Sequence, residues 1–445
     1  MFQWISTRLN LVIIGACIIA VIYIAVMPLL FLLWQSFFTP VVAGAPSEFT
    51  FANYSVAYGT NGNAKLLGNS LIFGIGTAIF SMFLGGFLAW INERTNTPFK
   101  TLFFTLALVP LIIPGILFTI SWIFLASPKI GIINLLLQNL LGTENIYVNI
   151  YSIWGMIWVE GLHYSPLAFL MMSAAFRSMD PSLEESAMMS GADIFQVTSK
   201  ITLRLVWPAI FATLLILFVR AIESFEVPAL LGLPVGIQVF TSAIYEALHH
   251  YPSKVGLASA YGTTLLIITA AGIYMQTTFS GKGNKYSTIG GKGFRPRTID
   301  LGGWRYLTAG IFISYFTLIV LLPFLILLWA SFQSFYAVPS IEGIKNLNLN
   351  AYRSIFEHPG IGGAVFNSLI LGLSCATIIM LITSVICWIV IKTKMPGRFF
   401  LNNIASLPLV FPGLVLSLSI MVFYLNIDIG VYGTLWILLI AYIIR

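Results

Sequence analysis

The chain has 445 residues, of which 58% are hydrophobic and 8% are charged, and its formal net charge is +7. Soluble globular domains carry about 25% charged residues, so this composition excludes an ordinary water-soluble fold. The three cysteines, Cys17, Cys375 and Cys387, all lie in apolar runs. They are expected to be small buried hydrophobic residues rather than a disulfide framework. We therefore interpret the chain as an integral membrane protein.

Nine apolar stretches reach the length of about 20 residues that a helix needs to cross a bilayer. In chain order they cover 11–34, 66–91, 101–126, 150–175, 206–232, 256–279, 304–331, 365–391 and 400–425, and a tenth begins near residue 431. Backbone polar groups must be paired within lipid, so each stretch is predicted to be a helix and the fold to be an all-α polytopic bundle. The first stretch exceeds the apolar core of a signal peptide and is predicted to be retained as an anchor.

Lysine and arginine are unevenly distributed among the loops. With the N-terminus on the cytoplasmic side, fifteen of them fall inside and five fall outside. The positive-inside rule favours this orientation. The asymmetry explains the net positive charge without a nucleic-acid partner, and it places the polar segment at about 177–206 in the cytoplasm.

This polar segment interrupts the apolar pattern between the fourth and fifth stretches. Asp180 and Pro181 suit the start of a helix. After Gly191, apolar residues such as Ile194 and Val197 recur at helical spacing. We predict two short helices joined at Gly191, which present a surface to a partner protein.

The segment resembles the signature cytoplasmic loop of the permease subunits of binding-protein-dependent ABC importers. In that family Glu-Ala-Ala, three residues, a glycine and nine further residues precede Ile-x-Leu-Pro. The matching positions are Glu185, Ala187, Gly191, Ile201 and Leu203, whereas Ser186 replaces an alanine and Arg204 stands in place of the proline. The resemblance implies that this loop, Glu184 included, docks on a separate ATPase subunit. The alternative is that Glu184 and Glu185 only stabilise a helix N-terminus electrostatically.

The chain repeats itself at an offset of 298 residues. The run at 69–72 recurs at 367–370, both reading Asn-Ser-Leu-Ile, and Pro110 and Pro114 recur as Pro408 and Pro412. We predict two homologous halves in parallel orientation, 1–280 and 304–445, joined by a cytoplasmic linker at 281–303. The second half is expected to be truncated, because it stops before its own copy of the polar loop. The prolines are expected to kink their helices, either as parts of a gate or for packing.

Charged residues also lie within the fifth apolar stretch, where Arg220, Glu223 and Glu226 precede Pro228. Their spacing of three places them on one helical face. An ionised group at the bilayer centre costs about 2.5–3.5 kcal/mol on insertion scales, so such groups are paired or face water. They are predicted to line a translocation path, and the alternative is a structural ion pair. This stretch resembles the Ser-Phe-Glu-x-Pro segment of permeases of ferric iron importers.

Two other polar groups have simpler interpretations. Glu160 and His163, one turn apart in the fourth stretch, are expected to be structural. Glu246, His249 and His250 lie in a predicted outer loop. Their side chains are of the kind that bind metals, but adjacent histidines in a loop are usually solvated, and no metal site is predicted.

The sequence contains no Gly-x-x-x-x-Gly-Lys-Ser/Thr motif and no metalloprotease or serine hydrolase motif. We therefore predict no ATPase site, no other catalytic site and no cofactor. The resemblance implies the permease subunit of an ATP-driven importer of the ferric-iron type in the bacterial inner membrane. It further implies two copies of a separate ATP-binding subunit and a periplasmic substrate-binding protein as partners. The alternatives are an importer of polyamine, thiamine or phosphonate, and a secondary transporter driven by an ion gradient.

Overall fold

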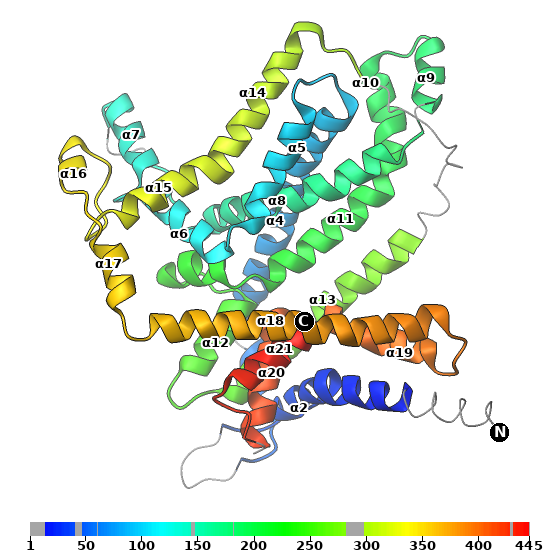
Figure 1. Ribbon diagram of the computed structural model, residues 1–445, viewed down its shortest axis with the longest axis vertical. Coiled ribbons are helices and arrows are strands. Elements are labelled where there is room, and N and C mark those ends of the chain that lie inside the picture. The colour runs from blue at the N-terminus through cyan, green and yellow to red at the C-terminus, as the bar shows by residue number, and fades with distance from the viewer. Residues whose placement is uncertain are drawn as a thin grey trace. The chain divides into compact units, whose positions relative to one another are not determined.

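The computed structural model describes residues 14–40, 47–59, 61–143, 147–180, 182–281, 298–427 and 430–444 (Figure 1). Within these ranges the only β-type pairings are two isolated bridges, Phe38 with Phe49 and Thr95 with Ile299. The predicted all-α fold is therefore confirmed. Pro181 and most of the predicted linker, 282–297, lie outside the described residues.

Six of the described helices are long and apolar enough to cross a membrane. They are Ile14–Gln35, Ala64–Arg94, Ile194–Glu223, Val255–Phe279, Gly302–Ser331 and Ile361–Lys392. Two bent pairs raise the number to eight if each counts as one span: Lys100–Ile112 with Gly115–Ala126, bent by 97°, and Pro228–Val235 with Phe240–His249, bent by 74°. Nine spans were predicted, but within the described residues the stretches 101–126, 206–232 and 400–425 are each interrupted and six to eight spans are found.

The breaks have local causes. In 101–126, Pro110 opens a 3₁₀ turn and Pro114 takes an extended ψ of 134°, so the chain stops being helical between α5 (Lys100–Leu108) and α6 (Gly115–Ala126). In 206–232, α11 (Leu203–Glu223) ends where Ser224 is extended, and a π-helical turn follows at Pro228–Gly232. The predicted span 150–175 is the single helix α8 (Ile153–Arg177), which contains Glu160 and His163.

The described chain divides into two compact units. The first comprises Met1–Ala64, Ala243–Ala270 and Arg353–Arg445, and the second comprises Lys65–Ser242 and Ala271–Tyr352. The further helices are α2 (Met27–Gln35), α3 (Ala52–Gly59), α4 (Asn61–Arg94), α7 (Ile132–Leu141), α12 (Phe240–His249), α13 (Val255–Gly281), α14 (Arg305–Phe316), α15 (Leu322–Ser331), α16 (Ile341–Lys345), α17 (Asn350–Glu357), α18 (Ile361–Cys387), α19 (Arg398–Ser406), α20 (Gly413–Asn426) and α21 (Leu435–Ile444).

The second unit holds the larger core. α4 and α8 approach so closely that a Cβ added to Gly85 would lie 2.2 Å from the Ser165 carbonyl oxygen. Phe103 of α5 stacks on Phe312 of α14 with ring centroids 4.8 Å apart. In the first unit, Phe31 of α2 meets Phe423 of α20 edge-on at 5.8 Å.

These units do not follow the sequence repeat, and helix exchange explains why. In the first unit α2 packs on α20, and in the second α15 packs on α6. By the sequence repeat, α15 corresponds to α2 and α20 corresponds to α6, so in both packed pairs a helix from one copy of the repeat contacts a helix from the other copy. Corresponding residues of the repeat also form matching hydrogen bonds. The hydroxyls of Ser36 and Tyr54 are hydrogen-bonded at 2.7 Å, and those of Ser331 and Tyr352 at 2.8 Å.

Candidate functional site: the 180–204 loop and the charges beyond it

The 180–204 loop folds as two capped helices, as the sequence predicted. α9 (Ser182–Met189) starts where the Asp180 carboxylate accepts a hydrogen bond of 2.9 Å from the Ser182 N–H. α10 (Ile194–Val197) starts at Asp193, whose carboxylate accepts one of 2.7 Å from the Gln196 N–H. A π-helical turn at Thr198–Thr202 then leads into α11. Short polar residues at both starts account for this fold, because their side chains bind the first unpaired N–H groups.

Gly191 ends α9 with a left-handed backbone, at φ = +89°. The Gly191 N–H donates to Met188 O, and the Ala192 N–H donates to Ala187 O, each at 3.0 Å. This is the cap that favours glycine after a helix. A Cβ added to Gly191 would meet no atom within 4 Å. Glycine is therefore required at this position for its backbone conformation and not for lack of space.

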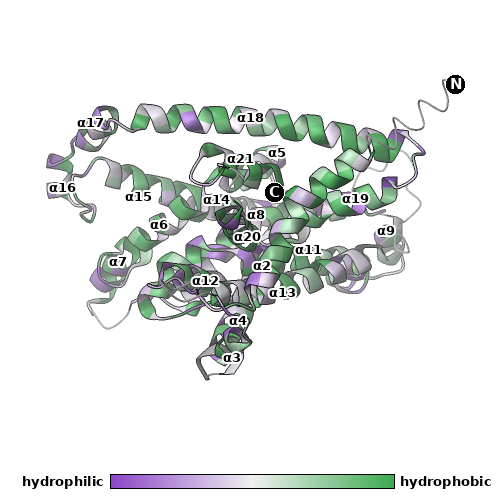
Figure 2. Ribbon diagram, turned by 90° about the horizontal axis from the view of Figure 1, so that it is seen from below, coloured by the Kyte–Doolittle hydropathy of each residue, from purple (hydrophilic) through white to green (hydrophobic). Residues whose placement is uncertain are grey.

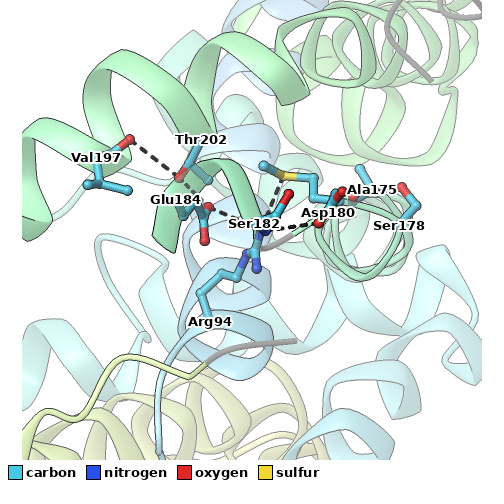
Figure 3. Close-up of polar contacts among 9 residues, drawn as sticks. Arg94, Ala175, Ser178, Asp180, Ser182, Glu184, Val197 and Thr202 are labelled. Carbon is cyan, nitrogen blue, oxygen red and sulfur yellow. Dashed lines mark hydrogen bonds and ion pairs between the residues drawn. The ribbon is translucent and has the colours of Figure 1, made fainter. Parts of the chain in front are cut away.

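Glu184 points into the protein rather than toward solvent. It is 7% exposed, and its Oε1 accepts hydrogen bonds from Arg94 Nη2 at 3.1 Å and from the Thr202 hydroxyl at 2.6 Å (Figure 3). Arg94, the last residue of α4, is 2% exposed. Neither Arg94 nor Thr202 was predicted to belong to the site. No local pattern joins these three residues, because they come from three different elements.

The opposite side of the loop is exposed and apolar. Met189 is 90% exposed and Phe195 is 81% exposed, and Leu183, Ile194 and Leu203 are exposed to a smaller extent. Of the residues matched to the signature, Gly191 and Leu203 are exposed, whereas Glu185, Ala187 and Ile201 are half-buried. The loop therefore has an inner face, where Glu184 is held, and an outer face of large apolar side chains.

The end of α4 makes two further attachments. Glu93 accepts two hydrogen bonds of 2.8 Å from Arg177, the last residue of α8. Next to Arg94, the backbone of Ile299 donates to Arg94 O at 2.7 Å and accepts from Asn96 N–H at 3.0 Å. A small cleft at this end of α4 is lined by Trp90, Arg94, Glu184, Met188, Val197 and Ile299, among others.

A second polar group, the charge cluster, consists of Glu160, His163, Arg220, Glu223 and Glu226. The predicted pairing of Arg220 with Glu223 is present, with Nη1 and Oε2 3.8 Å apart. Glu226 is exposed and follows the break after α11. A Cβ added to Gly115 at the start of α6 would lie 3.6 Å from His163 Nε2 and 3.9 Å from Glu226 Cδ.

Glu160 and His163 therefore belong to the same group as the charges of the fifth stretch, which sequence analysis treated separately. Glu160 is 3% exposed and lies near Ser224 and Tyr164, and the Tyr164 hydroxyl donates to Arg220 O at 3.3 Å. The charge cluster lies where the two helix breaks meet α8. It therefore combines charged side chains with backbone groups that are not paired within a helix. Pro228 itself is buried and opens the π-helical turn after Glu226.

In the described part of the chain, no group of three or more His, Cys, Asp and Glu side chains is placed to hold a metal ion. His249 Nδ1 lies 2.9 Å from Tyr245 O, and His250 Nδ1 lies 3.4 Å from Pro252 O, so each ring faces nearby backbone.

A family model described as "Binding-protein-dependent transport system inner membrane component" matches residues 80–282. The matched region contains both the 180–204 loop and the charge cluster.

The chain is also similar to several transport permeases. The Fe(3+)-transport system permease protein FbpB 2 of Haemophilus influenzae is 25% identical over 85% of this chain and 67% of its own length. Two further ferric-type permeases match 86% and 66% of this chain. The chain spans only 54% and 46% of the lengths of these two relatives, which is less than two thirds of each. The glucose import system permease protein GlcU of Saccharolobus solfataricus is 28% identical over 53% of this chain and 74% of its own length.

One solved structure has a comparable fold. It is a bacterial ABC transporter involved in the import of the acidic polysaccharide alginate, with a TM-score of 0.51 and 18% identity. The alignment covers 65% of this chain and 100% of that chain. At this identity the likeness shows the fold alone.

Proposed function

We propose that the chain is the membrane permease subunit of an ATP-driven importer in the bacterial inner membrane, with its N-terminus in the cytoplasm. In this proposal it has no ATPase site of its own and works with two copies of a separate ATP-binding subunit. A periplasmic substrate-binding protein delivers the solute. The observation that carries the proposal is the 180–204 loop, a capped helix pair that is fixed on its inner face and apolar on its outer face.

The outer face of the loop is the proposed contact with the ATP-binding subunit. Large apolar side chains such as Met189 and Phe195 are costly to expose on a polar segment unless another surface covers them. Glu185, Ala187, Gly191, Ile201 and Leu203 shape this face, while Glu184 acts from beneath it. Gly191 is needed because its left-handed backbone sets the angle between α9 and α10.

The charge cluster is the proposed lining of the translocation path. Arg220, Glu223 and Glu226 lie at the break before Pro228, and the N-terminal end of α6 lies beside Glu226. Charged groups within apolar spans are stable when they face water or a passing polar solute. We propose ferric iron as the solute on the strength of the three ferric-type relatives. The similarity to a glucose permease makes a sugar the second candidate.

We also propose that residues 1–280 and 304–445 are two repeats related by an axis along the membrane normal. The matching proline breaks support this arrangement, with Pro114 at φ −57° and ψ 134° and Pro412 at φ −56° and ψ 134°.

Site-directed crosslinking tests the docking face. Phe195→Cys, in a background in which the three native cysteines are replaced, is expected to crosslink to the ATP-binding subunit of the same importer in membrane vesicles. Tyr251→Cys, at a residue that is 96% exposed in the predicted outer loop, is the matched control and is expected not to crosslink. If a membrane-impermeant maleimide labelled the Phe195→Cys variant from the outer side, the orientation and the docking role would both be wrong.

Uptake measurements test the transported solute. Proteoliposomes that contain the permease, its ATP-binding subunit and its binding protein are expected to accumulate ferric iron only with ATP. Glucose supplied in the same assay is the comparison, and glucose uptake without iron uptake would assign the protein to sugar import. Uptake that persists without the ATP-binding subunit would indicate an ion-gradient-driven carrier.

A further inference from the structure

We infer that α4 is a rigid connecting element that carries movement of the 180–204 loop to the broken span that holds Glu226. This inference rests on the proposed function, because it assigns a mechanical role within ATP-driven import. It depends on attachments at both ends of α4, each made by side chains that sequence analysis did not join to the loop or to the charge cluster.

At one end, Arg94 fixes α4 to the loop. Its guanidinium reaches Glu184 of α9 at 3.1 Å and Met179 Sδ at 3.4 Å, and Glu184 also receives the Thr202 hydroxyl from the π-helical turn. Both charged partners are almost fully buried. Removing one partner of a buried ion pair costs far more stability than removing one partner of an exposed pair. The contacts of Arg94 and Glu184 therefore fix α9 and the start of α11 to the end of α4.

At the other end, α4 holds the chain at 238–241. Ser70 Oγ accepts a hydrogen bond of 3.0 Å from the Phe240 N–H, the first residue of α12, and Asn69 Nδ2 donates to Gln238 O at 3.2 Å. The next residue, Thr241, donates its hydroxyl to Ser224 O at 2.7 Å. Ser224 lies in the break two residues before Glu226, so this end of α4 is connected to the charge cluster through Phe240, Thr241 and Ser224.

Between the two ends α4 is an unbroken helix of 34 residues. Ser70 and Arg94 are separated by about 36 Å at 1.5 Å per residue, which is comparable to the thickness of a membrane. Close contact at Gly85 keeps α4 against α8, and α8 leads into the loop. A helix that is packed in this way transmits displacement along its axis instead of absorbing it, because a close-packed interior is not continuously deformable.

The control for the inference is the second ion pair at the same end of α4. Glu93 and Arg177 are joined by two hydrogen bonds of 2.8 Å, better geometry than that between Arg94 and Glu184. This pair connects α4 to α8 and does not involve α9, and its arginine is half exposed. If both ion pairs at this end of α4 contributed equally to coupling, breaking either pair would have the same effect on coupling.

The experiment measures ATP hydrolysed per solute imported in proteoliposomes that contain the full chain, its ATP-binding subunit and its binding protein. Glu184→Gln and Ser70→Ala are each expected to raise this ratio roughly fivefold or more, the lower range of coupling between linked sites. Thr202→Ser retains the hydroxyl and is expected to keep the wild-type ratio, whereas Thr202→Val is expected to raise it. Arg177→Met is expected to leave it unchanged.

Combining the changes at the two ends tests whether α4 is one element. Once Glu184→Gln has released the loop, adding Ser70→Ala is expected to have little further effect, so the double variant should be strongly non-additive. Additive effects, or a response of Arg177→Met equal to that of Glu184→Gln, would overturn the connecting role of α4. If the wild-type assembly shows no ATP-dependent uptake, the proposed function fails, whereas normal ratios in all variants of an active assembly refute this inference alone.

Discussion

α4 and α18 occupy corresponding places in the sequence repeat, yet their surroundings differ sharply. In α4 39% of the most apolar stretch is buried within the protein, and in Ile361–Lys392, which contains α18, none is. Both helices carry the run Asn-Ser-Leu-Ile near their start. Asn69 and Ser70 hydrogen-bond to the chain at 238–240, whereas among the described residues no such bond joins Asn367 or Ser368 to another segment.

An apolar pattern therefore predicts that a segment is helical, but it does not predict which other segments pack against that helix. α18 is hydrophobic along most of its length (Figure 2), which suits a helix against lipid. α4 is equally helical, but it carries Gly76 where Ile157 packs and Gly85 where the α8 backbone approaches. At the corresponding positions α18 has Ser374 and Thr383. At these two contact points α4 has glycine, which has no Cβ to hold the neighbouring helix away, whereas α18 has residues with a Cβ.

The largest expected effect comes from giving α4 the α18 residue at the closest contact. Gly85→Thr would place a Cβ 2.2 Å from the Ser165 carbonyl oxygen, so α4 and α8 would have to separate. Overpacking of this kind costs typically about 1–3 kcal/mol, and a backbone contact belongs at the upper end of that range. The thermal unfolding midpoint of the purified protein in lipid nanodiscs measures it.

The reciprocal change is the control. Thr383→Gly gives α18 the α4 residue at an exposed site, and it is expected to cost no more than about 1 kcal/mol, the intrinsic penalty of glycine in a helix. Equal losses in the two variants would mean that α4 and α18 are packed alike, which would remove the basis of the comparison.

A smaller effect is expected at the shared serine. Ser70→Ala leaves the buried Phe240 N–H without its acceptor, which costs about 1–3 kcal/mol locally. Ser368→Ala lies on the exposed surface of α18 and is expected to change stability by less than about 0.5 kcal/mol. Hydrogen exchange at residues 238–242 provides the measurement: exchange should accelerate only in Ser70→Ala, and acceleration in both variants would contradict the distinct role of Ser70.

Local features of both candidate sites could be predicted from sequence. The two helices of the loop, the turn at Gly191 and the pairing of Arg220 with Glu223 all depend on residues within a few positions of each other. The spacing of capping residues, glycine and like-facing charges is enough for such features. The all-α fold followed from composition and the length of the apolar stretches.

Contacts between distant segments could not be predicted in this way. Arg94 and Glu184 are 90 residues apart, and nothing in either local pattern indicates their pairing. The break at Ser224 lies within the predicted span 206–232, and hydropathy alone did not place the end of the helix there. The exchange of α2 and α15 between the repeats likewise depends on packing, because a repeat in sequence gives the order of helices but not their partners.

The smallest effect is expected at two corresponding positions of the repeat that share a left-handed backbone conformation but carry different residues. Phe99, just before α5, has φ = +59°, and Gly397, just before α19, has φ = +88°. Left-handed backbone costs a residue with a Cβ about 1–2 kcal/mol, which glycine avoids. Phe99→Gly removes that strain but adds about 0.4–1 kcal/mol of unfolded-chain entropy, so we expect a net stabilisation below about 1 kcal/mol. Gly397→Ala should destabilise by a similar amount, although its Cβ would have room, with Ile14 Cγ2 at 3.7 Å.

Denaturant titration of both variants against wild type measures these effects. A loss of stability in Phe99→Gly would mean that the Phe99 ring, edge-on to Phe103 at 6.4 Å, contributes more stability than its backbone strain costs.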